Sequence, residues 1–172
     1  ILSTNDNSIC GVDEQGESCM RGYNQMAGYN DNPKATAETI DSEGWLHTGD
    51  LGSMSANGYL KITGRVKEMI IRGGENLFPA EIEAALLEHP ALAEVAVAGV
   101  PDEKWGEIVA AFLRVADGFE RPSDDELKAF IRERLSPQKT PAHWVWIKEF
   151  PLTGSGKIQK FQLAERFAKG EL

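Results

Sequence analysis

The sequence predicts an α+β protein in two parts: a β-rich segment over residues 1–66 and a small α+β domain over residues 67–172. The first part is rich in Gly, Asn, Asp and Ser and has only short apolar stretches, a pattern typical of short strands and turns. In the second part strand-like and helix-like runs alternate, which predicts a short antiparallel sheet and three helices. Roughly 105 residues are enough for this domain to bury a core of its own.

Local signals place the helices and strands of the second part. Pro79 begins a helix, because the first amides of a helix lack intrahelical partners and proline costs nothing there. Ser123 with Glu126 forms a capping box that begins another helix. The expected elements are, in order, a hairpin around Gly73-Gly74 (residues 69–78), a helix from Pro79 to the His89-Pro90 pair, strands at 95–98 and 108–115, a helix after Ser123 through Leu135, a strand at 143–150 and a helix at 158–169.

Composition excludes several classes of function. The formal net charge is −9, and an acidic surface repels the phosphates of nucleic acids, so we expect no nucleic-acid partner. Residues 139–172, by contrast, have six basic against three acidic side chains, which suits an anionic small molecule. No apolar run reaches the roughly 18 residues of a membrane span, so no transmembrane segment is expected.

Cysteine and histidine usage bounds the redox and metal chemistry. Cys10 and Cys19 are too few for a disulfide framework and fit the reduced thiols of a cytoplasmic protein. His47, His89 and His143 lie far apart, and none is near a Cys, Asp or Glu cluster with metal-ligand spacing. We therefore expect no metal site in this chain.

A glycine-rich loop near the carboxyl end carries one lysine, in the segment PLTGSGKI at residues 151–158. A flexible loop of this kind can bring the Lys157 ammonium group to an anionic oxygen and withdraw it again. One alternative is an ordinary solvated turn between a strand and a helix. Another is a nucleotide-triphosphate loop, but that motif requires glycine where Pro151 stands and Ser or Thr where Ile158 stands.

Two upstream segments favour a functional lysine: GWLHTGDLG at residues 44–52 and GYLKITGRVKEMIIRGGENLFPAEIE at residues 58–83. Together with the lysine loop they resemble the later signature motifs of the adenylate-forming (AMP-binding) enzymes of the acyl-CoA synthetase/ligase type. The resemblance covers essentially the whole chain. It implies a carboxyl-terminal fragment, because the chain starts at Ile1 and lacks the family's triphosphate-binding loop and acidic metal-ligand motif. Residues 67–172 are then the carboxyl-terminal lid domain, and residues 1–66 are the end of the large amino-terminal domain.

The resemblance implies a reaction in two steps. A carboxylate attacks the α-phosphate of ATP to give acyl-AMP and pyrophosphate, and the thiol of CoA then displaces AMP to give acyl-CoA. Lys157 is the implied catalytic residue, because its charge would stabilise the carboxylate and phosphate oxygens as they react. The other implied site residues are Asp50, Ile62 and Arg65 for the nucleotide, Lys67 as the hinge of the lid, and Gly73, Gly74 and Glu75 along the tunnel for CoA.

Most of these residues also have a purely structural explanation. Asp50 suits a turn beside two glycines, and Arg65 suits a surface ion pair. Ile62 suits the core side of a strand. Gly73 and Gly74 suit a tight hairpin whose residues need positive φ.

The implied partners are a carboxylic acid, ATP, CoA and the missing amino-terminal domain, with Mg²⁺ held by residues outside this chain. A fatty acid is the expected substrate, since residues 21–29 are most similar to medium-chain fatty acyl ligases. The chain alone is expected to be inactive, because the triphosphate loop and the acyl pocket are absent.

Two alternatives stay open. One is the adenylation domain of a peptide synthetase, whose hinge is typically aspartate where this chain has Lys67. The other is a non-catalytic nucleotide-binding relative, against which the retention of Asp50, Arg65 and Lys157 argues.

Overall fold

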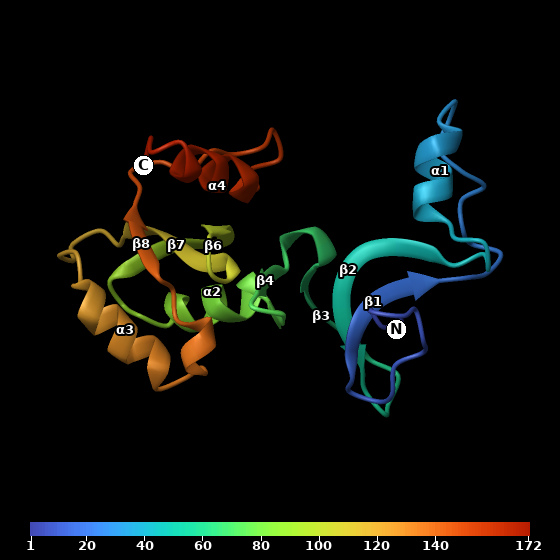
Figure 1. Ribbon diagram of the computed structural model, residues 1–172, viewed down its shortest axis with the longest axis horizontal. Helices are drawn as coiled ribbons and strands as arrows, with labels where there is room; N and C mark the ends of the chain where they lie inside the picture. Colours follow the sequence, from blue (N-terminus) through green and yellow to red (C-terminus); the bar gives the residue numbers. More distant parts are fainter. The chain divides into compact units, whose positions relative to one another are not determined.

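The computed structural model describes all 172 residues, which fall into two compact units, residues 1–67 and residues 68–172 (Figure 1). Each unit has its own sheet. None of the helices has the length and apolarity needed to cross a lipid bilayer.

The first unit contains a three-stranded antiparallel sheet in the order β1-β2-β3. Its strands are β1 (Gln15–Met20), β2 (Leu46–Met54) and β3 (Leu60–Arg65). Only two of its apolar side chains, Leu2 and Leu51, are buried. Hydrogen bonds between strands and polar side-chain contacts therefore hold this unit together more than apolar burial does.

One helix of the first unit, α1 (Pro33–Thr39), was not predicted. The Asn32 side chain caps it by accepting a hydrogen bond from the Ala35 amide at 3.0 Å, and Pro33 occupies its first turn. None of its residues is buried. The helix was missed because no apolar periodicity marks it and its only sequence signal is the local Asn-Pro pair.

The second unit is built on a five-stranded sheet. Its strands are β4 (Ile70–Arg72), β5 (Glu75–Leu77), β6 (Leu92–Asp102), β7 (Gly106–Val115) and β8 (His143–Trp146). The order is β5-β4-β7-β6, and β8 pairs with β7 in parallel. The expected antiparallel sheet is therefore confirmed for β4 to β7, and β8 adds one parallel pairing that the sequence did not predict. A parallel partner needs a long crossover, and the segment with α3 (Asp124–Arg132) and the 3-10 turn η2 (Pro137–Lys139) provides it.

Helices cover both faces of this sheet (Figure 1). The prediction of three helices is confirmed: α2 (Pro79–Leu87) and α3 pack on one face, and α4 (Lys160–Ala168) packs on the other. Alternate residues of a strand point to opposite faces. Val109, Ala111 and Leu113 of β7 accordingly join the core under α2 and α3, whereas Ala110 and Phe112 join the core under α4. The apolar run of β7 is continuous because neither of its faces meets water.

Two predicted boundaries move inward for identifiable reasons. The strand predicted at 143–150 ends at Trp146. The last helix begins at Lys160 rather than residue 158, because Ile158 forms an isolated β-bridge with Leu152. Ser123 caps α3 as predicted, accepting a hydrogen bond from the Glu126 amide at 3.2 Å.

A mostly buried lysine ties α4 to the rest of the second unit. The Lys160 ammonium lies 2.8 Å from a carboxylate oxygen of Glu68 and 2.8 Å from one of Glu83. The same Glu83 oxygen accepts a hydrogen bond from the Val97 amide at 2.7 Å. Burial by itself lowers the pKa of Lys160, but the charge of Glu83 and the hydrogen bonds of both carboxylates outweigh it and raise that pKa. Lys160 therefore stays charged and joins three separate segments.

Replacing this lysine by an apolar residue is expected to destabilise the second unit. In Lys160→Met, Glu83 and Glu68 lose their shared cation, while Glu83 stays mostly buried. The free energy of unfolding should therefore fall by roughly 2–3 kcal/mol. This is less than the cost of breaking a fully buried pair, because Glu68 is partly exposed. Urea denaturation followed by tryptophan fluorescence measures this change. Lys169→Met is the matched control, because Lys169 pairs with Glu165 within α4 at the protein surface. Equal stability of the two variants would contradict a structural role for Lys160.

Candidate functional site

Asp50 and Arg65 lie opposite each other in the first unit. They are partners in the register of β2 and β3, and the Arg65 Nε atom is 2.9 Å from an Asp50 carboxylate oxygen. The turn between the two strands brings together residues that are fifteen positions apart. The side chains are 57% and 32% exposed for Arg65 and Asp50. The structure thus places a carboxylate acceptor beside a guanidinium donor at an accessible edge, an arrangement that can bind hydroxyl groups. Their contact with ribose stays a prediction.

Ile62 is 53% exposed on β3 and is not part of a core within this unit. It lies three residues before Arg65 on the same strand and is paired in register with Gly52. An exposed apolar side chain of this kind is available to contact a sugar or base. Its explanation as a strand residue facing the core is not supported in this unit.

Lys67 is the last residue of the first compact unit. It is exposed and belongs to the 3-10 turn η1 (Val66–Glu68). A short turn between two compact bodies is a place where a few backbone dihedrals can change while the flanking structure stays rigid. Rotation at Lys67 remains a prediction.

Gly73 and Gly74 form the turn between β4 and β5, with φ angles of +58° and +88°. This backbone favours glycine at both positions. Gly73 is also fixed by packing, because its amide donates a hydrogen bond to the Trp105 carbonyl at 2.9 Å and a Cβ atom would lie 2.6 Å from the Trp105 ring. At Gly74 a Cβ atom would meet nothing within 4 Å. Glu75 follows as an exposed residue that pairs with Arg72 in the hairpin.

Two cations beside this turn were not singled out from the sequence. The Arg72 guanidinium and the Lys104 ammonium each lie 4.7 Å from the centre of the Trp105 ring. Trp105 is 38% exposed. The turn at Gly74 therefore lies near a partly exposed aromatic ring with two cations against it. Only the pairing of β4 with β7, which places Arg72 opposite Gly106, reveals this arrangement.

Lys157 lies on a closed turn rather than on the open, flexible loop that its composition suggested. The Thr153 amide donates to the Lys157 carbonyl at 2.8 Å, and the Lys157 amide donates to the Thr153 hydroxyl at 3.1 Å. Gly156 donates to the Thr153 carbonyl at 2.9 Å. The bridge between Leu152 and Ile158 closes the base of the turn. These bonds fix the backbone and leave the Lys157 side chain exposed.

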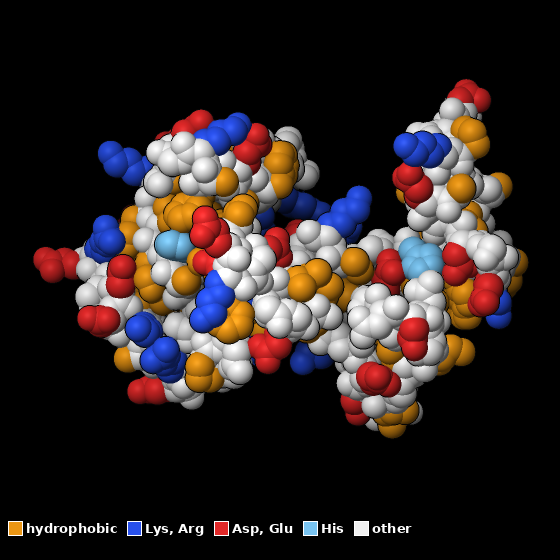
Figure 2. Space-filling view, viewed as in Figure 1, with side chains coloured by type: hydrophobic (Ala, Val, Ile, Leu, Met, Phe, Trp, Pro, Cys, Tyr) orange, Lys and Arg blue, Asp and Glu red, His pale blue; other side chains and the backbone are white.

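The basic excess of residues 139–172 is largely neutralised within the second unit. Lys139 pairs with Glu81, Lys160 with Glu83 and Lys169 with Glu165. Figure 2 shows acidic and basic side chains interspersed over the displayed face of this unit. Lys157 forms no ion pair of this kind. Its ammonium group is therefore free to meet an external anion.

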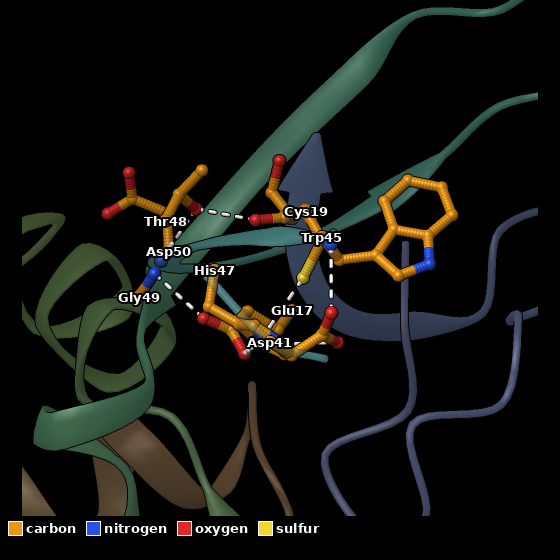
Figure 3. Close-up of polar contacts among 9 residues, drawn as sticks. Glu17, Cys19, Asp41, Trp45, His47, Thr48, Gly49 and Asp50 are labelled. Carbon is orange, nitrogen blue, oxygen red and sulfur yellow. Dashed lines mark hydrogen bonds and ion pairs between the residues drawn. The ribbon is translucent and has the colours of Figure 1, made fainter. Parts of the chain in front are cut away.

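A polar cluster around His47 was missed from the sequence (Figure 3). His47 Nδ1 lies 2.7 Å from a Glu17 carboxylate oxygen, and His47 Nε2 lies 3.3 Å from one of Asp41. The Cys19 sulfur is 3.5 Å from His47 Nδ1. The expectation that no histidine lies near a Cys, Asp or Glu cluster with metal-ligand spacing is therefore wrong for His47. The pairing of Cys19 with His47 in the β1–β2 register brings these distant residues together.

The charges in this cluster favour a protonated histidine. The hydrogen bond to Glu17, followed by that to Asp41, raises the pKa of His47 against the opposing effect of burial. Burial and the neighbouring Glu17 charge raise the pKa of the Cys19 thiol to about 11. The thiol is therefore neutral at pH 7, and the position of His47 between two carboxylates favours the charged form of its ring.

One potential metal-ligand atom from each of Glu17, Cys19 and His47 lies within 4.8 Å of the other two, a spacing at which a metal ion could bind. The distances favour direct hydrogen bonding instead. Two ligand atoms on a tetrahedral Zn²⁺ lie roughly 3.3 Å apart, whereas His47 Nδ1 and the Glu17 oxygen are 2.7 Å apart. Metal binding would also require His47 and Cys19 to lose protons, and the raised pKa of each group opposes that loss. The absence of a metal site stays a prediction.

Comparison with known proteins matches residues 81–157 to the AMP-binding enzyme C-terminal domain. The chain is 49% identical over 152 residues to a putative acyl-CoA synthetase, YngI of Bacillus subtilis. The aligned region covers 88% of this chain and 28% of that protein. It is 43% identical over 169 residues to the mitochondrial medium-chain acyl-CoA ligase ACSF2 of Homo sapiens, over 98% of this chain and 27% of that protein.

The fold is similar to that of a solved o-succinylbenzoate CoA synthetase from Bacillus subtilis, determined with its acyl-adenylate intermediate. The TM-score is 0.84 at 37% identity, over 94% of this chain and 33% of the other. The chain thus spans only about a third or less of the length of these proteins. The matched domain, the identities along nearly the whole chain and the shared fold agree with the resemblance read from the motifs. The relatives that match it along most of its length are named acyl-CoA synthetases or ligases. The chain therefore belongs to the AMP-binding, adenylate-forming enzymes and contains their C-terminal domain.

Proposed function

We propose that this chain is the carboxyl-terminal part of an ATP-dependent, AMP-forming acyl-CoA ligase. In the first step a carboxylate oxygen bonds to the α-phosphorus of ATP and pyrophosphate leaves. In the second step the CoA sulfur bonds to the acyl carbon, loses its proton and displaces AMP. The observation that carries this proposal is the unpaired Lys157 on a closed turn, in a chain that also presents the Asp50–Arg65 pair.

Asp50 and Arg65 would hold the ribose of the nucleotide. The ionised Asp50 carboxylate accepts hydrogen bonds from ribose hydroxyls, and the Arg65 guanidinium donates to their oxygens. Their 2.9 Å contact fixes the two groups relative to each other before a nucleotide arrives. Ile62, exposed on the same strand as Arg65, would pack against the sugar or base.

Lys157 would act only in adenylation. Charge builds on the carboxylate and the α-phosphate as the new bond forms, and a preorganised ammonium group stabilises it. At an effective dielectric constant near 20, two unit charges about 4 Å apart attract by about 4 kcal/mol. That energy corresponds to roughly two to three orders of magnitude in rate.

CoA would approach the second unit at the turn between β4 and β5. The open space at Gly74 lets a narrow thiol arm pass close to the backbone. Arg72 and Lys104 beside Trp105 suit the phosphates of CoA. Mg²⁺ prefers oxygen ligands, and the cluster of Glu17, Cys19 and His47 does not fit it, because two of the three side chains offer a sulfur and a ring nitrogen. Its ligands are proposed to lie outside this chain.

The domain organisation that fits this reaction assigns residues 1–66 to the large amino-terminal domain and residues 67–172 to the lid. The division of the chain into two compact units supports rotation at Lys67 between the two steps. A fatty acid is the proposed substrate, since one relative is named a medium-chain acyl-CoA ligase. A cytoplasmic location is proposed from the reduced cysteines, although that relative is mitochondrial.

Removal of the Lys157 ammonium should impair one step of the cycle. In the full-length enzyme, Lys157→Ala is expected to lower acyl-AMP formation, measured by carboxylate-dependent ATP–pyrophosphate exchange, by about two to three orders of magnitude. Given preformed acyl-AMP, the variant should transfer the acyl group to CoA at a near-normal rate. Lys169→Ala, which removes a surface lysine of the same unit, should leave both rates unchanged. A similar loss in both steps for Lys157→Ala would contradict a role limited to adenylation.

A bulky side chain at Gly74 should obstruct the thiol arm. Gly74→Leu in the full-length enzyme is expected to raise the KM for CoA or slow the thioester step, while ATP–pyrophosphate exchange survives. Gly118→Leu controls for backbone strain, because Gly118 also has a positive φ, +83°, and open space around it. If the two variants slow the thioester step equally, or neither does, Gly74 serves only its turn.

A further inference from the structure

Glu17 uses both of its carboxylate oxygens to hold one short segment of β2. One oxygen accepts a hydrogen bond from the Gly49 amide at 2.8 Å, and the other lies 2.7 Å from His47 Nδ1. The Glu17 side chain is only 14% exposed. These two contacts flank Thr48 and end one residue before Asp50. Figure 3 shows the Glu17 carboxylate between His47 and Gly49, with Asp50 next along the strand.

We propose that Glu17 is a positioning residue for the nucleotide: from β1 it fixes the Thr48–Gly49–Asp50 segment through His47 and the Gly49 amide, so that Asp50 stays opposite Arg65. The part of this inference that concerns the nucleotide rests on the function proposed above. The part that concerns the backbone does not.

The backbone of β2 needs such a support at this point. Cys19 pairs with His47 and Glu17 pairs with Leu51, so one residue of β1 stands opposite three residues of β2. A bulge of this kind interrupts the regular ladder of backbone hydrogen bonds. Gly49 within it has a φ of +74°, in the left-handed region. Side chains must therefore supply bonds that the ladder does not.

Two side chains supply these bonds. The Glu17 carboxylate accepts a hydrogen bond from the Gly49 amide, and the Thr48 hydroxyl donates one to the Ser18 carbonyl at 2.7 Å. The same hydroxyl accepts a hydrogen bond from the Asp50 amide at 3.1 Å. The position of Asp50 therefore depends on a short chain of contacts that begins on β1.

His47 provides the charge that balances Glu17. The groups facing its ring are Glu17 and Cys19 from β1 and Asp41 from the segment before β2. Asp41 is fixed in turn, because its other oxygen accepts hydrogen bonds from the amides of Glu43 and Trp45 at 2.9 and 2.8 Å. Protonated His47 donates from both ring nitrogens, one to each carboxylate. Loss of its proton would leave an unprotonated nitrogen facing one of them.

The pH dependence follows from the raised pKa of His47. The folded protein binds this proton more tightly than the unfolded chain, whose histidine titrates near 6.5. The stabilisation is therefore fully present below the unfolded pKa and is lost as the pH rises through the higher folded pKa. Nucleotide affinity should fall over the same pH interval.

Three variants of the full-length enzyme test the proposal. Glu17→Ala removes both contacts, and Glu17→Gln keeps a hydrogen-bonding oxygen but removes the charge. Glu14→Gln is the matched control, because Glu14 also accepts a hydrogen bond from a backbone amide, that of Gly11 at 2.7 Å, but at an exposed turn before β1. The measurements are the Kd for AMP, the KM values for ATP and for the carboxylic acid, and the His47 pKa by NMR titration.

Glu17→Ala is expected to raise the Kd for AMP and the KM for ATP by about tenfold, the effect of losing one charge-assisted hydrogen bond. The KM for the carboxylic acid should change less than twofold. Glu17→Gln should lower the His47 pKa and shift the pH dependence of AMP binding to lower pH. Unchanged AMP binding in Glu17→Ala, or an equal rise of both KM values, would overturn the proposal.

Failure of the proposed function gives a different result. In that case the wild-type enzyme shows no adenylation and no AMP binding. Hydrogen exchange at the Gly49 and Asp50 amides of the 172-residue chain then still tests the positioning role. Exchange should be faster in Glu17→Gln than in wild type or Glu14→Gln, and equal exchange in all three would refute it. If Glu17→Ala does not fold, Glu17→Gln provides every readout named above.

Discussion

The antiparallel pairing of β6 with β7 is the contact on which the second unit depends. The ladder runs from Leu92 opposite Val115 to Asp102 opposite Gly106. Because alternate side chains leave a strand on opposite faces, one ladder builds two cores, one under α2 and α3 and one under α4. The hairpin of β4 and β5 and the parallel strand β8 both join this pair at the free edge of β7. The candidate site residues of this unit are carried by turns attached to that framework.

Lys157 and Lys160 lie three residues apart but differ in burial and in ion pairing. Lys160 is mostly buried, is bound to two carboxylates and ties α4 to α2 and to the segment before β4. Lys157 lies on the turn just before this helix, fixed through its backbone but exposed through its side chain. Lys160 gives the turn a rigid base, because its ion pairs hold the helix that follows the turn. Lys157 can then meet an anion without first breaking an ion pair.

The first unit obeys a different balance of forces. With so few buried apolar side chains, its geometry is set by strand register and by charge-assisted hydrogen bonds. The Glu17–His47–Asp41 cluster and the Asp50–Arg65 pair are both parts of this polar framework. Charged contacts of this sort are directional, so they fix the position of the Asp50 carboxylate more closely than a small apolar core does.

The sequence by itself determined the family, the α+β class, the three helices of the second unit and those candidate residues that lie in the motifs, such as Asp50, Arg65 and Lys157. These follow from motifs, capping residues and periodicity, which are local properties of the chain. Tertiary structure decided the rest. The parallel pairing of β8, the pairing of Asp50 with Arg65 and the contact of Glu17 with His47 join residues at least fifteen positions apart. Which strands pair, and in which register, depends on packing over the whole sheet, and no local pattern records it. The closed form of the Lys157 turn was likewise decided by hydrogen bonds of Thr153 that composition alone does not reveal.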